Sequence, residues 1–118
     1  AMLGDKSTEM ELMDHWKGAL LHSGYLLFEL VSPAENKRRF YYLAWQPTLF
    51  DVQAVVRVYG RKGGLQRSLA PVAFDSLEEA WPFIRDTVLR RLRHGYEVVS
   101  PRVAPGDPLQ DSVQDWAD

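Results

Sequence analysis

The stretch DVQAVVRVYGRKGG, residues 51–64, holds the alternating run that decides the fold and a loop of basic residues and glycines. Alternate positions of residues 51–59 form two sets. One set is Val52, Ala54, Val56 and Val58, and the other is Gln53, Val55, Arg57 and Tyr59. A period of two is typical of a half-buried antiparallel strand. We expect the valine-rich set to face the core and the set with Arg57 and Tyr59 to be dispensable for it.

Further strands are indicated on both sides of this run. The apolar and aromatic segments 25–31 and 38–45 flank the turn-forming residues SPAENK, which predicts a β-hairpin with a longer loop. Residues 66–74 predict a fourth strand, which Pro71 confines to a sheet edge or splits. A short last strand is expected at 97–99.

Two helices complete the pattern. The sequence TEMELMDHWKGALLHSG, residues 8–24, predicts the first, with capping-box spacing of Thr8 and Glu11 and a stop at Gly24. Its apolar residues at helical spacing are Met13, Trp16 and Leu20.

The stretch SLEEAWPFIRDTVLRRLRHGY, residues 76–96, predicts the main helix, with a second capping box, Ser76 and Glu79, and a stop at Gly95. Its apolar stripe, within about 120° of one face, is Leu77, Ala80, Trp81, Ile84, Val88 and Leu92. Pro82 is expected to kink this helix or break its first turn. The fold class is therefore α+β, with an antiparallel sheet of four to five strands, one main helix packed on it and an N-terminal helix.

Charge is distributed unevenly along the 118 residues. Residues 1–36 hold six acidic and two basic side chains, residues 37–93 hold eleven basic and five acidic ones, and residues 94–118 hold one basic and five acidic ones. A basic middle between acidic ends suggests a face for an anionic partner. A well-solvated surface is the alternative that charge alone leaves open.

Several function classes are excluded by composition and motif. The chain has no cysteine, which excludes disulfides and thiolate chemistry and fits a cytoplasmic protein. No apolar run reaches the roughly 18 residues of a membrane helix. His15 and His22 lack a third ligand, and residues 60–64 lack the Gly-Lys-Ser/Thr ending of a phosphate-binding loop. We therefore expect no enzyme, no cofactor, no metal and no membrane association.

The loop YGRKGG, residues 59–64, allows two interpretations. In the first, Gly63 and Gly64 supply positive φ in a hairpin turn. In the second, successive backbone N–H groups form an anion-binding concavity to which Arg61 and Lys62 add charge. The two are compatible, because a turn can also bind.

Four segments, in order and at matching spacing, resemble the WGR domain family. They are NKRRFYYLAWQPTLF (36–50), VRVYGRKG (56–63), FDSLEEAW (74–81) and RRLRHGY (90–96), and the resemblance covers Leu26 to Val99. It implies a compact antiparallel sheet with one helix packed on it. The family includes domains of poly(ADP-ribose) polymerases that contact DNA at strand breaks, and small bacterial proteins described as DNA-binding domains. It implies a binding role and no catalytic one.

The resemblance also implies which residues bind. Tyr59 stands where the family has the signature tryptophan that stacks on a terminal sugar, and Gly60 and Arg61 complete the signature. Arg91 stands where the family often has lysine; its place in the apolar stripe favours a partly covered stem or an ion pair over a ligand contact. The chain departs from the family at two points. Tyr59 keeps a stacking face but a smaller one, and the early position of Gly64 indicates a different loop shape.

The sequence thus predicts a nucleic-acid-binding module for DNA ends or nicks without base specificity. Its expected site residues are Arg57, Tyr59, Gly60, Arg61, Lys62, Lys37, Arg38 and Arg39. The alternative is a protein-interaction module that docks a partner through the N-terminal helix or exposed aromatic residues. The expected organisation is a helical extension (1–24), the WGR-like domain (25–99) and an acidic, proline-containing tail (100–118).

Overall fold

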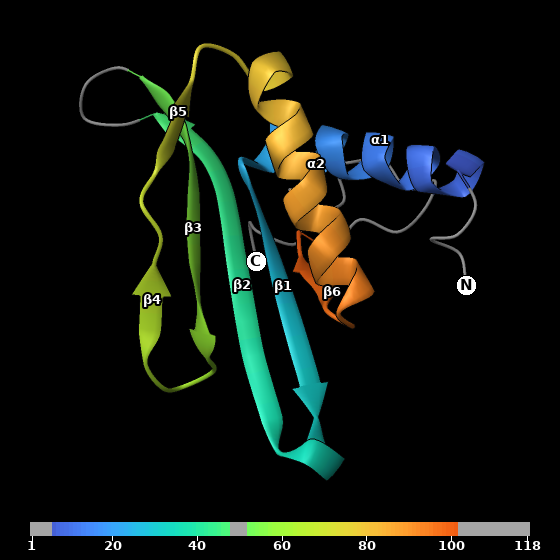
Figure 1. The fold of residues 1–118 in the computed structure, drawn as a ribbon, viewed down its shortest axis with the longest axis vertical. Helices are drawn as coiled ribbons and strands as arrows, with labels where there is room; N and C mark the ends of the chain where they lie inside the picture. The colour runs from blue at the N-terminus through green and yellow to red at the C-terminus, as the bar shows by residue number, and fades with distance from the viewer. Residues whose placement is uncertain (1–5, 48–51, 102–118) are drawn as a thin grey trace.

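A computed structural model of the chain describes residues 6–47 and 52–101 (Figure 1). Its elements in chain order are α1 (Lys6–Ser23), β1 (Tyr25–Ser32), the 3-10 turn η2 (Pro33–Glu35), β2 (Lys37–Pro47), β3 (Gln53–Arg61), β4 (Gln66–Ser68), β5 (Val72–Phe74), α2 (Leu77–Arg93) and β6 (Glu97–Ser100). The predicted α+β fold, with an antiparallel sheet, a main helix and an N-terminal helix, is confirmed. The predicted acidic tail lies outside the described residues from residue 102 onward.

The strands form one antiparallel sheet in the order β4-β3-β2-β1-β6, with β5 also paired to β3. The predicted hairpin is β1 and β2, whose register runs from Tyr25 opposite Ala44 to Ser32 opposite Lys37. Its connection contains η2 and ends at Asn36 in the left-handed region, with φ of 55°. This hairpin extends well beyond the end of α2 (Figure 1).

The predicted fourth strand is divided in two at Pro71. β4 pairs with the end of β3 and β5 pairs with its beginning, while the residues between them, 69–71, belong to neither strand. Proline has no N–H to donate to a sheet ladder, so the split that the sequence predicts is confirmed.

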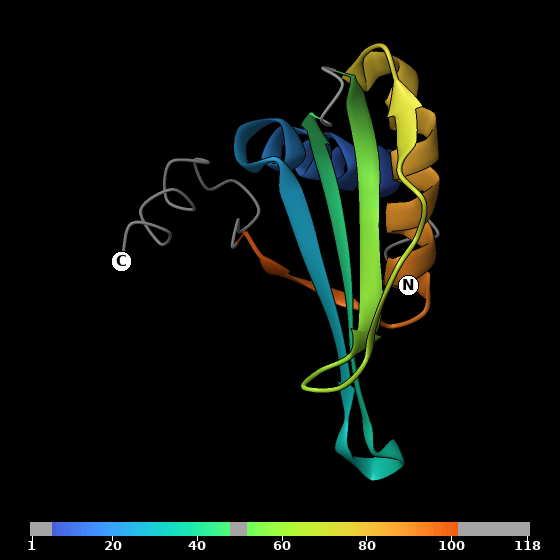
Figure 2. The same cartoon turned by 90° about the vertical axis from the view of Figure 1, so that its left-hand side faces the viewer.

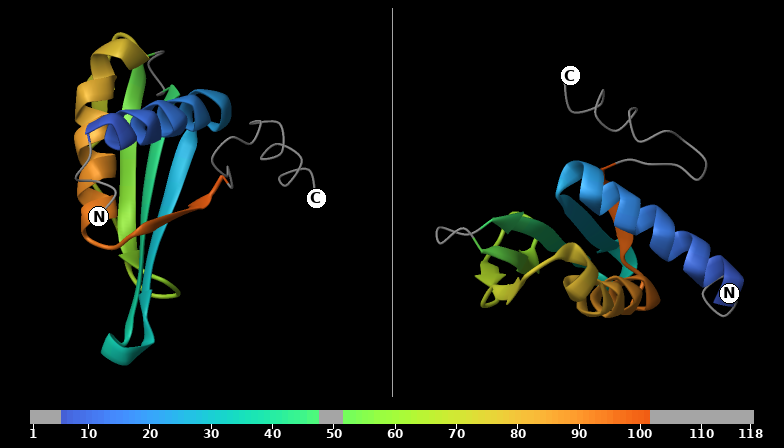
Figure 3. Two further views of the ribbon diagram at one scale, coloured as in Figure 1. Left: turned by 90° about the vertical axis from the view of Figure 1, so that its right-hand side faces the viewer. Right: turned by 90° about the horizontal axis from the view of Figure 1, so that it is seen from above.

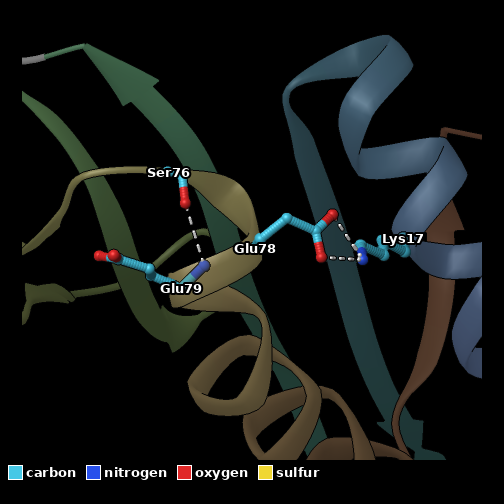
Figure 4. Close-up of polar contacts among 4 residues, drawn as sticks. All are labelled: Lys17, Ser76, Glu78 and Glu79. Carbon is cyan, nitrogen blue, oxygen red and sulfur yellow. Dashed lines mark hydrogen bonds and ion pairs between the residues drawn. The ribbon is translucent and has the colours of Figure 1, made fainter.

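Helix α2 packs as its sequence predicts, and of the predicted capping box the structure shows the bond made by the Ser76 side chain. The Oγ of Ser76 accepts a hydrogen bond of 3.2 Å from the backbone N–H of Glu79 (Figure 4). The predicted stripe is buried or packed against the core, with Leu89 buried in addition. Of the two outcomes expected at Pro82, a kink or a broken first turn, the break does not occur: the helix is continuous, and the N–H of Ala80 donates to the Ser76 carbonyl at 3.1 Å. Buried residues of α2 lie on both sides of Pro82, namely Leu77, Ala80, Ile84, Val88 and Leu89.

Helix α1 crosses near the start of β1, while α2 runs along one face of the sheet (Figures 2 and 3). Met13, Ala19 and Leu20 of α1 are buried in the same core as α2 and the sheet. The ammonium of Lys17 lies 3.0 Å from a carboxylate oxygen of Glu78 and thereby bridges the two helices (Figure 4). No helix in the described residues has the length and apolarity that a bilayer crossing requires.

The beginning of α1 differs from the prediction, and its end does not. The helix starts at Lys6, so Thr8 lies within it and the predicted capping box with Glu11 is wrong. Residues 6 and 7 include neither proline nor glycine, so nothing in them stops the helix from extending upstream. Gly24 ends it with φ of 85°, and its N–H donates to the Leu20 carbonyl at 2.7 Å.

The face of β3 that meets the core is the opposite of the one expected. Val55 belongs to the core and Tyr59 packs against it, whereas Val56 and Val58 lie on the outer face of the sheet. On that outer face Val58 lies opposite Tyr42, and burial raises the pKa of the Tyr42 phenol. Both faces of β3 carry apolar side chains, so the alternation does not tell which face the helices cover.

Candidate nucleic-acid interface

A basic concavity lies on the helix-bearing face of the sheet, where the strands continue past the end of α2. Its volume is about 560 Å³. Its lining residues come from η2, β2, β3, the β3–β4 loop, β4, α2 and the turn after α2; they are Glu35, Asn36, Lys37, Arg38, Arg39, Phe40, Tyr59, Gly60, Arg61, Leu65, Arg67, Arg91 and Tyr96.

Six cationic side chains surround this space and face one carboxylate. The ammonium of Lys37 lies 2.8 Å from the carboxylate of Glu35, and this hydrogen bond and charge lower the pKa of Glu35. The five arginines, by contrast, have no ion pair within the described part of the chain; they are Arg38, Arg39, Arg61, Arg67 and Arg91. The concavity therefore carries a positive charge that the described residues do not neutralise.

Strand register brings these charges together. Arg39 of β2 lies directly opposite Arg61 of β3, and Tyr59 lies between Tyr41 of β2 and Arg67 of β4. Side chains that are directly opposite across antiparallel strands share a face and lie close together, and like charges in such pairs are destabilising. The juxtaposition of Arg39 and Arg61 is thus unfavourable in the free protein, and an anion in the concavity would relieve it.

The ring of Tyr59 forms part of the wall. It stacks on Tyr41, with ring centroids 6.1 Å apart and planes inclined by 19°, and it is partly buried against the core. The Tyr59 ring therefore packs against the core on one side and borders the concavity on the other.

The loop after Tyr59 is a tight, internally hydrogen-bonded turn. A Cβ atom on Gly60 would overlap the Leu65 carbonyl oxygen, so only glycine fits this close approach of backbone. The N–H groups of Arg61, Lys62 and Gly64 donate to the carbonyls of Leu65, Arg38 and Arg61. Because these three donors are occupied, they do not form the anion-binding concavity of backbone N–H groups that the second interpretation of the loop requires.

Two of the residues predicted for the site lie elsewhere. The ammonium of Lys62 is 3.0 Å from the carboxylate of Glu29, and the guanidinium of Arg57 lies over the ring of Phe83, 4.9 Å from its centroid. Neither lines the concavity, whereas Lys37, Arg38, Arg39, Tyr59, Gly60 and Arg61 do. Arg57 and Tyr59 share a face of β3. Helix α2 packs over Arg57, through the ring of Phe83, and ends before it reaches Tyr59.

Seven lining residues were not among those predicted, and they are Glu35, Asn36, Phe40, Leu65, Arg67, Arg91 and Tyr96. The position of Arg67 opposite Tyr59 depends on the register of β3 and β4. That register follows from the length of the turn between the two strands, which can be read from the sequence. Arg91 and Tyr96 meet only because of how α2 ends. No three His, Asp or Glu side chains gather as a metal site in residues 6–47 and 52–101.

Comparison with known proteins identifies the family. The family model of the WGR domain matches residues 25–103, more than half of the chain. No curated protein and no solved structure matches the sequence. The matched region contains every strand and α2, together with all the residues that line the concavity. The chain belongs to the WGR domain family.

Proposed function

We propose that the concavity binds DNA at ends or nicks, without base specificity. The observation that supports it most strongly is the group of five arginines without carboxylate partners around one concave surface. Arginine is the side chain best suited to the planar, bidentate recognition of phosphate oxygens. WGR domains are nucleic-acid-binding, non-catalytic domains as a class.

The size and shape of the surface favour a strand terminus. A volume of about 560 Å³ is that of a site for a small ligand of nucleotide size, and it is too small to enclose a duplex. A nucleotide is accessible for such a contact where the strand is interrupted. Tyr59 offers a ring for the terminal sugar or base, and the arginines that line the same concavity would contact the flanking phosphates.

Base specificity is not part of the proposal. Reading bases requires a helix or ribbon that enters the major groove with side chains aimed at base edges. The cationic residues here project from strand ends and from the last turn of α2 into a concave surface. Contacts of this kind position a protein on the phosphate backbone and carry no sequence information. Arg57 and Lys62 lie outside the proposed contact.

A pair of DNA dumbbells tests this function. An intact dumbbell, closed by hairpins at both ends, has no terminus, and the same molecule with a single nick has one interruption. Fluorescence anisotropy at low salt is expected to show at least about tenfold tighter binding to the nicked form, equivalent to roughly 1.4 kcal/mol. Equal affinity for the two would reduce the proposal to general polyanion binding.

A groove between the helices supports a second candidate function, the docking of a protein partner. It has a volume of about 570 Å³, and its apolar lining is Met10, Met13, Trp81 and Leu89. Met10 is 68% exposed, and methionine adapts readily to the shape of an apolar partner. An absence of DNA binding at low salt would favour this function over the first.

A further inference from the structure

Arg91 has surroundings unlike those of the other cationic residues of the concavity. Its guanidinium carbon lies 4.7 Å from the ring centroid of Tyr41 and 5.4 Å from that of Tyr96. Its Nε is buried and has no hydrogen-bond partner in the described structure. The Nε of Arg57, outside the concavity, is likewise buried without a partner, so the two rings and its place in the concavity are what set Arg91 apart.

The end of α2 builds this arrangement. Gly95 has φ of 92°, its N–H donates to the Leu92 carbonyl at 3.1 Å, and the Tyr96 N–H donates to the Arg91 carbonyl at 3.0 Å. These two bonds form a Schellman motif, in which the residue after the glycine folds back on the last full turn of the helix. The contact that is usually apolar in this motif is here the ring of Tyr96 on the side chain of Arg91.

The rings restrain the guanidinium and leave its edge for a ligand. A stacked guanidinium has lost much of the rotamer freedom that a free arginine would lose on binding, so less is lost for each hydrogen bond that it forms. No carboxylate of the described residues pairs with the Arg91 guanidinium. The same holds for the four other arginines that line the concavity. The cationic charge of Arg91 at the C-terminal end of α2 is itself favourable.

We propose that Arg91 is a preorganised phosphate-binding residue, which donates from its guanidinium edge to two oxygens of one phosphate group of the bound strand. This assignment rests on the proposed function of the concavity. It replaces the expectation that Arg91 only covers apolar surface or forms an ion pair. The phosphate is either a terminal one or an internal one of the strand, because both present the same pair of oxygens.

The variant Arg91→Lys tests the assignment, because it keeps the charge and removes the planar fork. Affinity for the nicked dumbbell, measured on folded protein, is expected to fall about tenfold while the salt dependence stays nearly unchanged. Nicked dumbbells with a phosphate or a hydroxyl at the nick distinguish the sources: a loss confined to the phosphorylated form identifies a terminal phosphate, and an equal loss identifies an internal one. If Arg91→Lys binds like the wild type, Arg91 is structural and the assignment is wrong.

A second measurement follows the wild-type protein and uses Arg91→Lys only to assign the resonance. The Nε–H of Arg91, protected by burial, is expected as a resolved arginine resonance in a proton–nitrogen correlation spectrum, absent from Arg91→Lys. Titration with the nicked dumbbell should shift it, and binding without any shift would overturn the assignment. A wild-type protein that does not bind DNA would overturn the proposed function itself, which is a distinguishable result.

Discussion

Arg39 and Arg61 lie directly opposite each other on neighbouring strands, and neither forms an ion pair within the described residues. Such a pair is unfavourable for folding. Lys62, the neighbour of Arg61 in the chain, is instead paired with Glu29. Of these two adjacent cationic residues, Lys62 is therefore neutralised by a carboxylate, whereas Arg61 belongs to a cluster of arginines without carboxylate partners. The proposed phosphate-binding role of the concavity would account for this difference.

The two adjacent cations give a matched comparison. Arg61→Ala should weaken binding to nicked DNA by about 1 to 2 kcal/mol, because a charge-assisted phosphate contact is lost. Its folding stability should be unchanged or should rise by up to about 0.5 kcal/mol, because the repulsion with Arg39 is removed. Lys62→Ala removes the same charge from the same loop and should change affinity by a few tenths of a kcal/mol. Equal losses of affinity would show a diffuse electrostatic effect and no defined site.

Tyr59 is expected to contribute to both stability and binding, since its ring stacks on Tyr41 and also lines the concavity. Tyr59→Ala should cost about 2 kcal/mol of unfolding free energy and about 1 to 3 kcal/mol of DNA affinity per folded molecule. Tyr59→Trp should retain binding or tighten it. Anisotropy on folded protein and thermal melting measure the two effects separately.

Tyr59→Leu is the control for packing. Leucine keeps apolar bulk against Tyr41 but offers no ring face to a nucleotide. If the leucine variant binds DNA as tightly as the wild type, stacking is not what Tyr59 does, and its role is confined to the core.

The glycines of the loop should differ sharply in their tolerance of substitution. Gly60→Ala places a Cβ against the Leu65 carbonyl and should cost at least about 2 kcal/mol of stability, because backbone has to move. Gly63 has φ of 75° with open space around it, so Gly63→Asn should cost less than about 1 kcal/mol, asparagine being tolerant of this conformation. Thermal melting of the two variants measures both losses of stability. A Gly60→Ala variant that loses little stability would contradict the close approach of Gly60 to the Leu65 carbonyl.

The sequence predicts the elements well because their signals are local. Each signal acts within a few residues. The signals are the alternation of side chains along β3, the proline at 71, the cap at Ser76 and the glycine at 95. The core-bearing face of β3 could not be assigned, because it depends on where α2 lies across the sheet. For the same reason Arg57 and Tyr59, which share a face, are separated by the end of the helix. Arg67 and Arg91 join Tyr59 only through strand register and the Schellman turn.

The salt dependence of binding to nicked DNA tests the central claim most directly. If three to five phosphates are contacted, log K should fall with log salt with a slope of about −3 to −4. The double variant Arg39→Ala/Arg61→Ala should make this slope less steep by about two. The Lys62→Ala variant should leave the slope nearly unchanged. A flat salt response, or no binding at low salt, would contradict the account of the concavity as a phosphate-binding surface.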